Sequence, residues 1–148
     1  ELYASQAALV HGDVSPKNIL LRKQGPVLLD AECATMGDPA FDVAFCLNHL
    51  VLKSIHLPAM RAALLPAIGQ FWASYAASVN WEAPDALEAR VTALLPALML
   101  ARVDGKSPVE YLTAVGKAVA RDEGRRLFRE RAATIGGFVE SLRSGLGS

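Results

Sequence analysis

The chain has 148 residues, 52% of them hydrophobic and 20% charged, with 15 basic and 15 acidic residues. This balance is typical of one globular domain with a sizeable core and excludes an intrinsically disordered chain. The zero formal net charge gives no reason to expect nucleic acid or an anionic membrane as a partner. No run of eighteen apolar residues and no secretory leader occurs, so we expect a cytoplasmic protein without membrane contact.

The first third of the sequence alternates short apolar runs with polar loops. In chain order we predict the end of a helix at 1–8, a strand at 8–11, and the two strands of a hairpin at 18–21 and 26–30. Gly25 and Pro26 are expected to form the hairpin turn. Cys33 and Cys46 are too few for a disulfide framework, so we expect two buried thiols in a reducing compartment.

Apolar residues at helical spacing follow Asp38 and continue almost to the end of the chain. We predict helices at 39–55, 60–75, 84–103, 108–121 and 122–143. Asp38 should cap the first helix with Pro39 as its first residue. Pro66 and Pro96 should bend or split their helices. The fold class is therefore α+β and mainly helical, in a single domain spanning 1–148.

A helix start is also expected in the stretch GKSPVEYL, residues 105–112. Ser107 would be the N-cap, Pro108 the first helical residue, and Glu110 the third residue. Serine at the N-cap with glutamate at the third position is the pattern of a capping box.

Three oxygen-bearing side chains in the first third suggest a site for phosphate chemistry. Asp13 and Asn18 lie five residues apart in one loop, and Asp30 ends the second strand of the hairpin. A strand pair returns its end towards its start, so Asp30 should approach Asn18. Two such oxygens suit Mg²⁺ bound to phosphates, and Asp13 is then free to accept a proton from an attacking hydroxyl.

The segments HGDVSPKN and VLLDAE resemble the catalytic segments of the aminoglycoside phosphotransferase family, which is similar in fold to the protein kinases. That family carries His-Gly-Asp, four residues and then Asn, where protein kinases carry His-Arg-Asp with the same spacing. The segments GDPAFDVA and ARVDGKSPVEYL are also similar to stretches of the family. The resemblance implies the C-terminal lobe of a protein-kinase-like fold, in which a small β hairpin carries the catalytic loop.

The resemblance implies a role for each matching residue. Asp13 would orient and deprotonate the substrate hydroxyl, while Asn18 and Asp30 would hold Mg²⁺ on the phosphates of ATP. His11 would brace the loop by hydrogen bonds, and Asp42 would anchor the loop from the helix below.

Ser15, Lys17 and Glu32 are the remaining candidates, for contacts with phosphate or substrate. Protein kinases carry a lysine two residues after the catalytic aspartate, where this chain has Ser15. A solvated surface lysine is an equal alternative for Lys17, and Glu32 is expected to face the substrate or a metal-bound water.

The resemblance implies an ATP-dependent phosphotransferase acting on a small-molecule hydroxyl. The sequence contains no glycine-rich nucleotide loop and no Walker A motif. We therefore expect a C-terminal lobe lacking its nucleotide-binding N-terminal lobe, inactive by itself and prone to self-association through exposed apolar surface. The alternative is an inactive helical interaction module or a pseudokinase relative. The sequence does not identify the acceptor.

Overall fold

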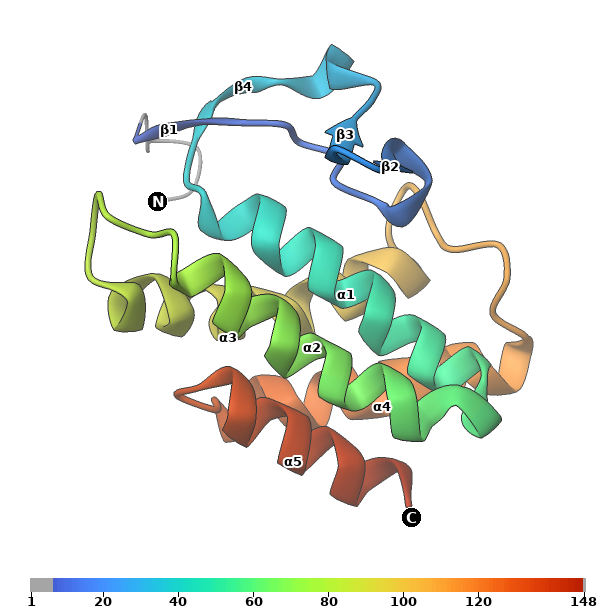
Figure 1. Cartoon of the computed structure of the whole chain (residues 1–148). Coiled ribbons are helices and arrows are strands. Elements are labelled where there is room, and N and C mark those ends of the chain that lie inside the picture. Colours follow the sequence, from blue (N-terminus) through green and yellow to red (C-terminus); the bar gives the residue numbers. More distant parts are fainter. Residues whose placement is uncertain (1–6, 148) are drawn as a thin grey trace.

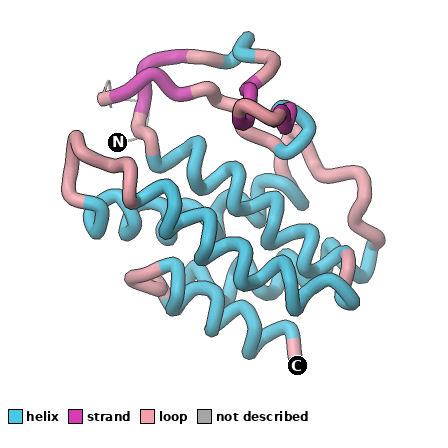
Figure 2. Tube along the Cα trace, viewed as in Figure 1, coloured by secondary structure: helices cyan, strands magenta, loops and turns pink. Residues whose placement is uncertain are grey.

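The computed structural model describes residues 7–147, which form a small β layer on a larger helical layer (Figures 1 and 2). The strands are β1 (Ala8–Val10), β2 (Ile19–Arg22), β3 (Gly25–Leu28) and β4 (Thr35–Gly37), and the helices are α1 (Ala40–His56), α2 (Arg61–Ala76), α3 (Pro84–Asp104), α4 (Ala114–Glu130) and α5 (Ile135–Leu146). Short 3₁₀ turns are η2 (Pro16–Asn18), η3 (Ala31–Cys33) and η4 (Pro58–Met60). The α+β, mainly helical fold class is confirmed. The predicted helix end at 1–8 falls mostly outside the described residues, and Ala8 already belongs to β1.

The β layer consists of two antiparallel strand pairs. β2 pairs with β3 as predicted, but Arg22 is directly opposite Gly25, so the turn consists of Lys23 and Gln24. The prediction that Gly25 and Pro26 form the turn is therefore wrong. Gly25 has φ +119°, a backbone conformation that residues with a Cβ rarely adopt. β1 pairs with β4, a strand that the local sequence pattern did not predict.

The helical layer contains one continuous apolar core, with α1 directly beneath the β layer (Figure 1). All five helices contribute large, fully buried side chains to it: Leu47, Leu52, Leu65, Ile68, Leu87, Leu95, Met99, Leu127, Phe138 and Leu142. Pro66 and Pro96 lie inside α2 and α3, and neither divides its helix. Asp38 caps α1 through Oδ1, which accepts from Ala40 N at 2.9 Å, although the helix begins one residue later than expected.

The predicted helix start at Ser107 is wrong, because the chain crosses 105–113 without forming a helix. Val109 N instead donates to Arg102 O at 2.8 Å, and Val109 and Leu112 are buried against the core. Tertiary burial of these two apolar side chains thus outweighs the local capping pattern. α4 starts at Ala114, where the Thr113 side chain accepts from Gly116 N at 3.1 Å.

The predicted junction at 121 and 122 also differs from the structure, since α4 continues through it to Glu130. The chain turns at Arg131, which has φ +51°, and α5 begins after Thr134. The Thr134 side chain accepts from Gly137 N at 3.1 Å. A left-handed residue followed by a new N-cap separates two helices.

Within residues 7–147, no individual helix combines the length and apolar character needed to cross a membrane. The helical stretches 40–56 and 58–76 together reach that length and composition, but they bend by 119° at their junction.

Candidate active site

The loop between β1 and β2 is fastened to the helical layer by one carboxylate. Asp42, in the first turn of α1, accepts from His11 N at 2.6 Å through Oδ2 and from Gly12 N at 2.9 Å through Oδ1. Hydrogen bonds from backbone amides to a carboxylate are charge-assisted and stronger than neutral ones. Asp42 therefore fixes where the loop leaves β1.

Gly12 is the residue that lets the loop pass close to η3. It has φ +82°, and a Cβ built on it would lie 2.7 Å from Cys33 O and 2.9 Å from Cys33 Cβ. The pairing of β1 with β4 brings Cys33 to this point, since Val10 is opposite Thr35. Both the backbone conformation and the close approach thus require glycine.

His11 links the loop to the end of the hairpin through both ring nitrogens. Asp13 N donates to Nδ1 at 3.3 Å, and Nε2 lies 2.9 Å from Leu29 O. Since Nδ1 accepts, the proton is on Nε2, which donates to the carbonyl, and the ring is the neutral tautomer. Both nitrogens are occupied by backbone groups, so His11 holds the loop in place.

Asp13 and Asn18 contact each other directly. Asn18 Nδ2 donates to Asp13 Oδ2 at 2.9 Å and to Asp13 O at 3.0 Å. Asn18 is buried and Asp13 is half-buried. Lys17 Nζ lies 3.6 Å from Asp13 Oδ2, but its side chain is 72% exposed, so this ion pair contributes little.

Asp30 follows Leu29, whose backbone hydrogen bonds join the end of the hairpin to the loop between β1 and β2. Leu29 N donates to Asn18 O at 2.8 Å, and Leu29 O is the acceptor for His11. Asp30 itself is exposed, with φ +63° and ψ +57°, a left-handed conformation that aspartate tolerates better than most residues. Asp13, Asn18 and Asp30 therefore belong to one group of adjoining loops. Glu32 is exposed in η3 beside them.

Among residues 7–147, no three His, Cys, Asp or Glu side chains group together as a metal cluster. The side-chain oxygens that could bind a metal ion are those of the Asp30 carboxylate and Asn18 Oδ1, since Asn18 Nδ2 donates to Asp13. One charged and one neutral oxygen fit Mg²⁺, which usually takes few protein ligands and fills its octahedron with water and phosphate oxygens. The donor set thus fits a magnesium–nucleotide complex and lacks the ligands of an all-protein metal site.

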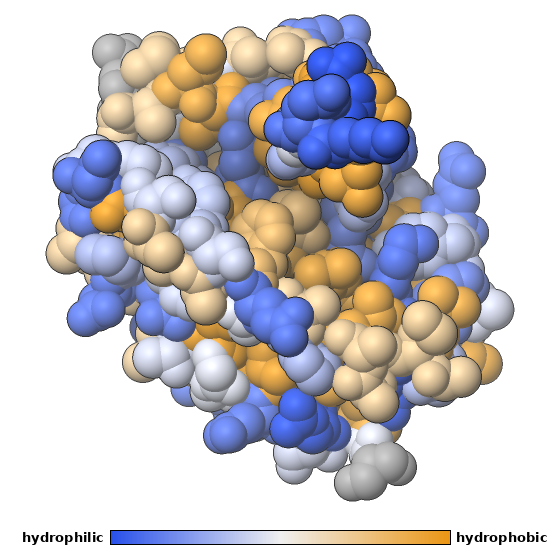
Figure 3. Space-filling model, in the orientation of Figure 1, coloured by the Kyte–Doolittle hydropathy of each residue, from blue (hydrophilic) through white to orange (hydrophobic). Residues whose placement is uncertain are grey.

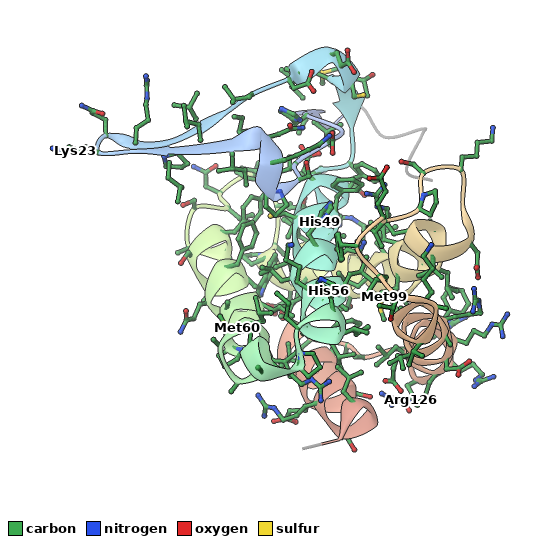
Figure 4. All side chains as sticks on the ribbon, turned by 90° about the vertical axis from the view of Figure 1, so that its right-hand side faces the viewer. Lys23, His49, His56, Met60, Met99 and Arg126 are labelled. Carbon is green, nitrogen blue, oxygen red and sulfur yellow. The ribbon has the colours of Figure 1, made fainter. Side chains whose placement is uncertain are left out.

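A cleft of about 950 Å³ opens beside Asp13. The cleft is bounded by the loop between β1 and β2, η3, one side of α1, the end of α3 and the segment 105–113. Its lining residues are Gly12, Asp13, Ser15, Pro16, Lys17, Cys33, Phe45, His49, Lys53, Arg102, Ser107, Pro108, Val109, Glu110 and Tyr111. The side view in Figure 4 shows α1 with His49 labelled below the β layer.

Four buried polar atoms on the walls of this cleft have no hydrogen-bond partner among the described residues. They are Ser15 Oγ, His49 Nε2, Arg102 Nε and Tyr111 OH. Buried polar groups are nearly always paired in folded proteins. A group of unpaired ones around one cleft is the arrangement expected where a polar ligand binds.

Sequence reasoning assigned Ser15 and Lys17 to the site but missed His49, Lys53, Arg102 and Tyr111. The available signal was the spacing of Phe45, His49 and Lys53, which recur every four residues and so share one face of α1. Burial lowers the pKa of His49 to about 4, with the charge of Arg102 as the next cause. The ring is therefore neutral at pH 7.

The two cysteines differ from the expectation that both are buried. Cys46 is buried, and burial, followed by the charge of Asp42, raises the pKa of its thiol to about 11. Cys33 is exposed and lines the cleft. Cys33 lies in η3, outside the apolar core, which explains its exposure.

A second, apolar hollow of about 270 Å³ lies between the β layer and the helices, lined by side chains that include Leu9, Leu28, Phe71, Tyr75 and Trp81. Figure 3 shows orange, apolar surface on the β layer and a hollow below it. The aromatic rings of α2 therefore contribute both to the core, through Trp72, and to this surface.

Comparison with known proteins identifies one family. The model of the phosphotransferase enzyme family matches residues 2–87, which is more than half of the chain and includes the loop between β1 and β2, the hairpin, α1 and α2. No curated protein matches the chain.

Proposed function

Because the chain belongs to the phosphotransferase enzyme family, we propose that it serves ATP-dependent transfer of the γ-phosphoryl group to a hydroxyl of a small molecule. The observation that carries this proposal is the position of Asp13. Its carboxylate is held at the edge of a large cleft by Asn18, in a loop that the hydrogen bonds of Asp42 and of the His11 ring hold in place.

Asp13 acts as the proton acceptor in this proposal. Asn18 donates to Oδ2, which leaves Oδ1 for the hydroxyl of the acceptor. As the acceptor oxygen forms its bond to the γ-phosphorus, its proton passes to Asp13, and the bond to the bridging oxygen breaks to release ADP. Positioning of the hydroxyl supplies most of what this reaction asks of a protein.

Asn18 and Asp30 are the residues that would hold Mg²⁺. When bound, the ion neutralises phosphate charge as the phosphoryl group is transferred. Lys17, which lies beside Asp13, would contact a phosphate oxygen, and Ser15 Oγ, which has no partner among the described residues, is a second candidate donor on the same loop. Glu32 would face the substrate or a metal-bound water.

The complete natural polypeptide, assayed with Mg-ATP and a panel of alcohols, tests the proposal. Asp13→Asn should lower kcat by about 10²- to 10⁴-fold, the range for removal of a general base. The control is Asp85→Asn, an exposed carboxylate in the first turn of α3, which should leave kcat unchanged. Phosphoryl transfer that survives in Asp13→Asn would contradict the role of Asp13.

The 148 residues alone are expected to turn over little ATP. Their sequence has no glycine-rich nucleotide loop and no Walker A motif, and phosphoryl transfer requires such a cradle for the phosphates. ATP-dependent turnover by this chain at an ordinary enzyme rate would contradict this part of the proposal.

A second candidate function, an inactive interaction module or pseudokinase relative, is favoured by the apolar surface of the β layer. Leu9 and Leu21 are 74% and 80% exposed, and contiguous exposed apolar side chains are typical of association surfaces. Under this alternative, no alcohol is phosphorylated by the complete polypeptide. Light scattering should then show self-association of the 148-residue chain that Leu21→Lys weakens and Lys23→Met does not.

A further inference from the structure

Building on the proposed phosphotransferase function, we infer that the cleft beside Asp13 selects an acceptor alcohol that carries an anionic group, a carboxylate or a phosphate. The function alone does not require this, since phosphotransferases act on cationic, neutral and anionic alcohols. The inference comes from the charges on the cleft walls and from what neutralises them.

The cleft contains three cationic side chains, Lys17, Lys53 and Arg102, and two carboxylates, Asp13 and Glu110. Lys17 and Asp13 already face each other at 3.6 Å. In the described part of the chain, neither Lys53 nor Arg102 forms a salt bridge. Two positive charges therefore remain without a carboxylate partner.

Arg102 is held by neutral groups, which leave its charge uncompensated. Its Nη1 donates to Ser107 O at 2.6 Å and to Ser107 Oγ at 3.1 Å. Its Nε is buried and has no partner among the described residues. A guanidinium presents several donors in one plane, the geometry that suits the oxygens of a carboxylate or a phosphate.

Lys53 lies on the same wall, on the face of α1 that carries His49. Its Nζ is 4.7 Å from the centroid of the Tyr111 ring, while Arg102 Cζ is 5.9 Å from that of Phe45. Contact with an aromatic face positions a cation without neutralising it. Both charges are thus held in place at the cleft and remain free to attract an anion.

His49 reports the same electrostatic environment. Its pKa is lowered to about 4 by burial first, and then by Arg102, Lys53 and Lys17, while Asp13 acts in the opposite direction. The neutral ring, with Nε2 unpaired, is suited to a hydroxyl of the same ligand. A polyamine acceptor would face these cationic side chains, and of the described residues that line the cleft only Glu110 would offer it a carboxylate that is not already paired.

Binding of a matched set of six-carbon polyols to the 148-residue chain tests the inference. Gluconate, glucitol 1-phosphate, glucitol and glucamine differ in the group at C1: carboxylate, phosphate, hydroxyl and amine. Calorimetry or NMR titration at pH 7.5 should show at least tenfold tighter binding for one or both anions than for glucitol, with glucamine weakest. The stronger of the two anions identifies the group that the acceptor carries.

Lys53→Met keeps most of the side-chain length and removes the charge, so it should abolish most of the preference for the anion. Lys23→Met is the matched control, because Lys23 lies at the hairpin turn, far from His49 in the view of Figure 4. Circular dichroism of both variants shows whether the fold is retained. Should Lys53→Met lose the fold, Arg102→Gln takes its place, since it removes the other uncompensated charge, and it should likewise abolish most of the preference for the anion.

Equal binding of the four polyols, no binding of either anion, a preference for glucamine, or an anion preference that persists in Lys53→Met would each overturn the inference. These binding measurements need neither ATP nor catalysis. A failure here would leave the phosphotransfer assay of Asp13→Asn unaffected, and a failure of that assay would leave the anion preference unaffected.

Discussion

The β layer and the helical layer are stabilised in different ways. The apolar core consists of side chains from the helices and from Val109 and Leu112, and no residue of β1 to β4 within the described range 7–147 belongs to it. In the β layer Val10 is buried, but Leu9, Leu20, Leu21 and Leu28 are exposed. The layer that carries Asp13 and Asp30 is therefore joined to the helices in large part by polar contacts, among them the hydrogen bonds of Asp42 and the ion pair of Asp38 with Arg90. The helical layer is stabilised by burial of apolar area.

This difference assigns separate tasks to the two layers. The helical layer supplies a rigid floor, from which Asp42, His49, Lys53 and Arg102 project. The β layer supplies loops whose backbone can approach a ligand closely, as Gly12 does with Cys33. Functional residues on loops over a rigid scaffold are a common arrangement, and here a perturbation of either layer should have a distinct signature.

The largest effect is expected from the core of the helical layer. Phe138, on α5, is 1% exposed, and Phe138→Ala should lower the free energy of unfolding by about 3 to 5 kcal/mol. Urea denaturation followed by circular dichroism measures this. Phe128→Ala, at a half-exposed position on α4, is the control and should cost less than about 1 kcal/mol. Equal costs for the two would contradict the separation of core and surface.

A smaller, local effect is expected where the two layers join. Asp42→Ala removes the acceptor of the His11 and Gly12 amides, at a cost of about 3 kcal/mol from charge-assisted hydrogen bonds. Hydrogen exchange should show faster exchange at these amides and in β1 and β4, while the core of α3 stays protected. Asp42→Asn should cost less, because one acceptor oxygen remains. Uniform loss of protection in both layers would show that the β layer and the core unfold together.

His49, which lines the cleft, should make the free energy of unfolding depend on pH. The pKa of His49 is lowered from 6.5 to about 4 in the folded protein, mainly by burial. Below pH 6.5 the unfolded chain binds a proton that the folded chain does not, so stability falls as the pH is lowered towards 4. Between pH 7.5 and pH 5 the loss should be about 2 kcal/mol. His49→Phe should show a flatter profile in urea denaturation, and an unchanged slope would contradict this assignment.

The smallest expected effect is a difference in thiol reactivity between the two layers. Cys33, in the β layer, is exposed, while Cys46, in α1, is buried and its pKa is raised to about 11. Since the thiolate is the reactive form, iodoacetamide at pH 8 should label Cys33 within minutes and leave Cys46 unlabelled until urea is added. Peptide mass spectrometry gives the site, with Cys33→Ala as the control. Early labelling of Cys46 in the native protein would indicate that the helical layer opens readily.

Local pattern was sufficient for several elements. The alternation of apolar runs predicted β1 and the hairpin, and helical periodicity predicted α1, α2 and α3 with ends within a few residues. Asp13 and Asn18 in one loop, with Asp30 after a strand pair, predicted a site for phosphate chemistry, and the segment HGDVSPKN carried the resemblance to a phosphotransferase family. These features follow from backbone periodicity and from residues that are neighbours in the chain.

Local pattern was not sufficient where distant segments meet. The sequence rules favoured a helix at Ser107, but burial of Val109 and Leu112 against the core holds that segment in an irregular, non-helical path along the cleft. β4 is a strand because β1 lies opposite it. The partners of a non-local contact leave no signal in a short window of sequence.

The sequence by itself therefore determined α1 to α3, the hairpin and the family to which the chain belongs, since these depend on the order and spacing of neighbouring residues. Tertiary structure alone decided that Asp42 holds His11 and Gly12, and that His49, Lys53, Arg102 and Tyr111 face one cleft with Asp13. The physical reason is that such contacts depend on how α1, α3 and segment 105–113 pack together, and packing is a property of the whole folded chain.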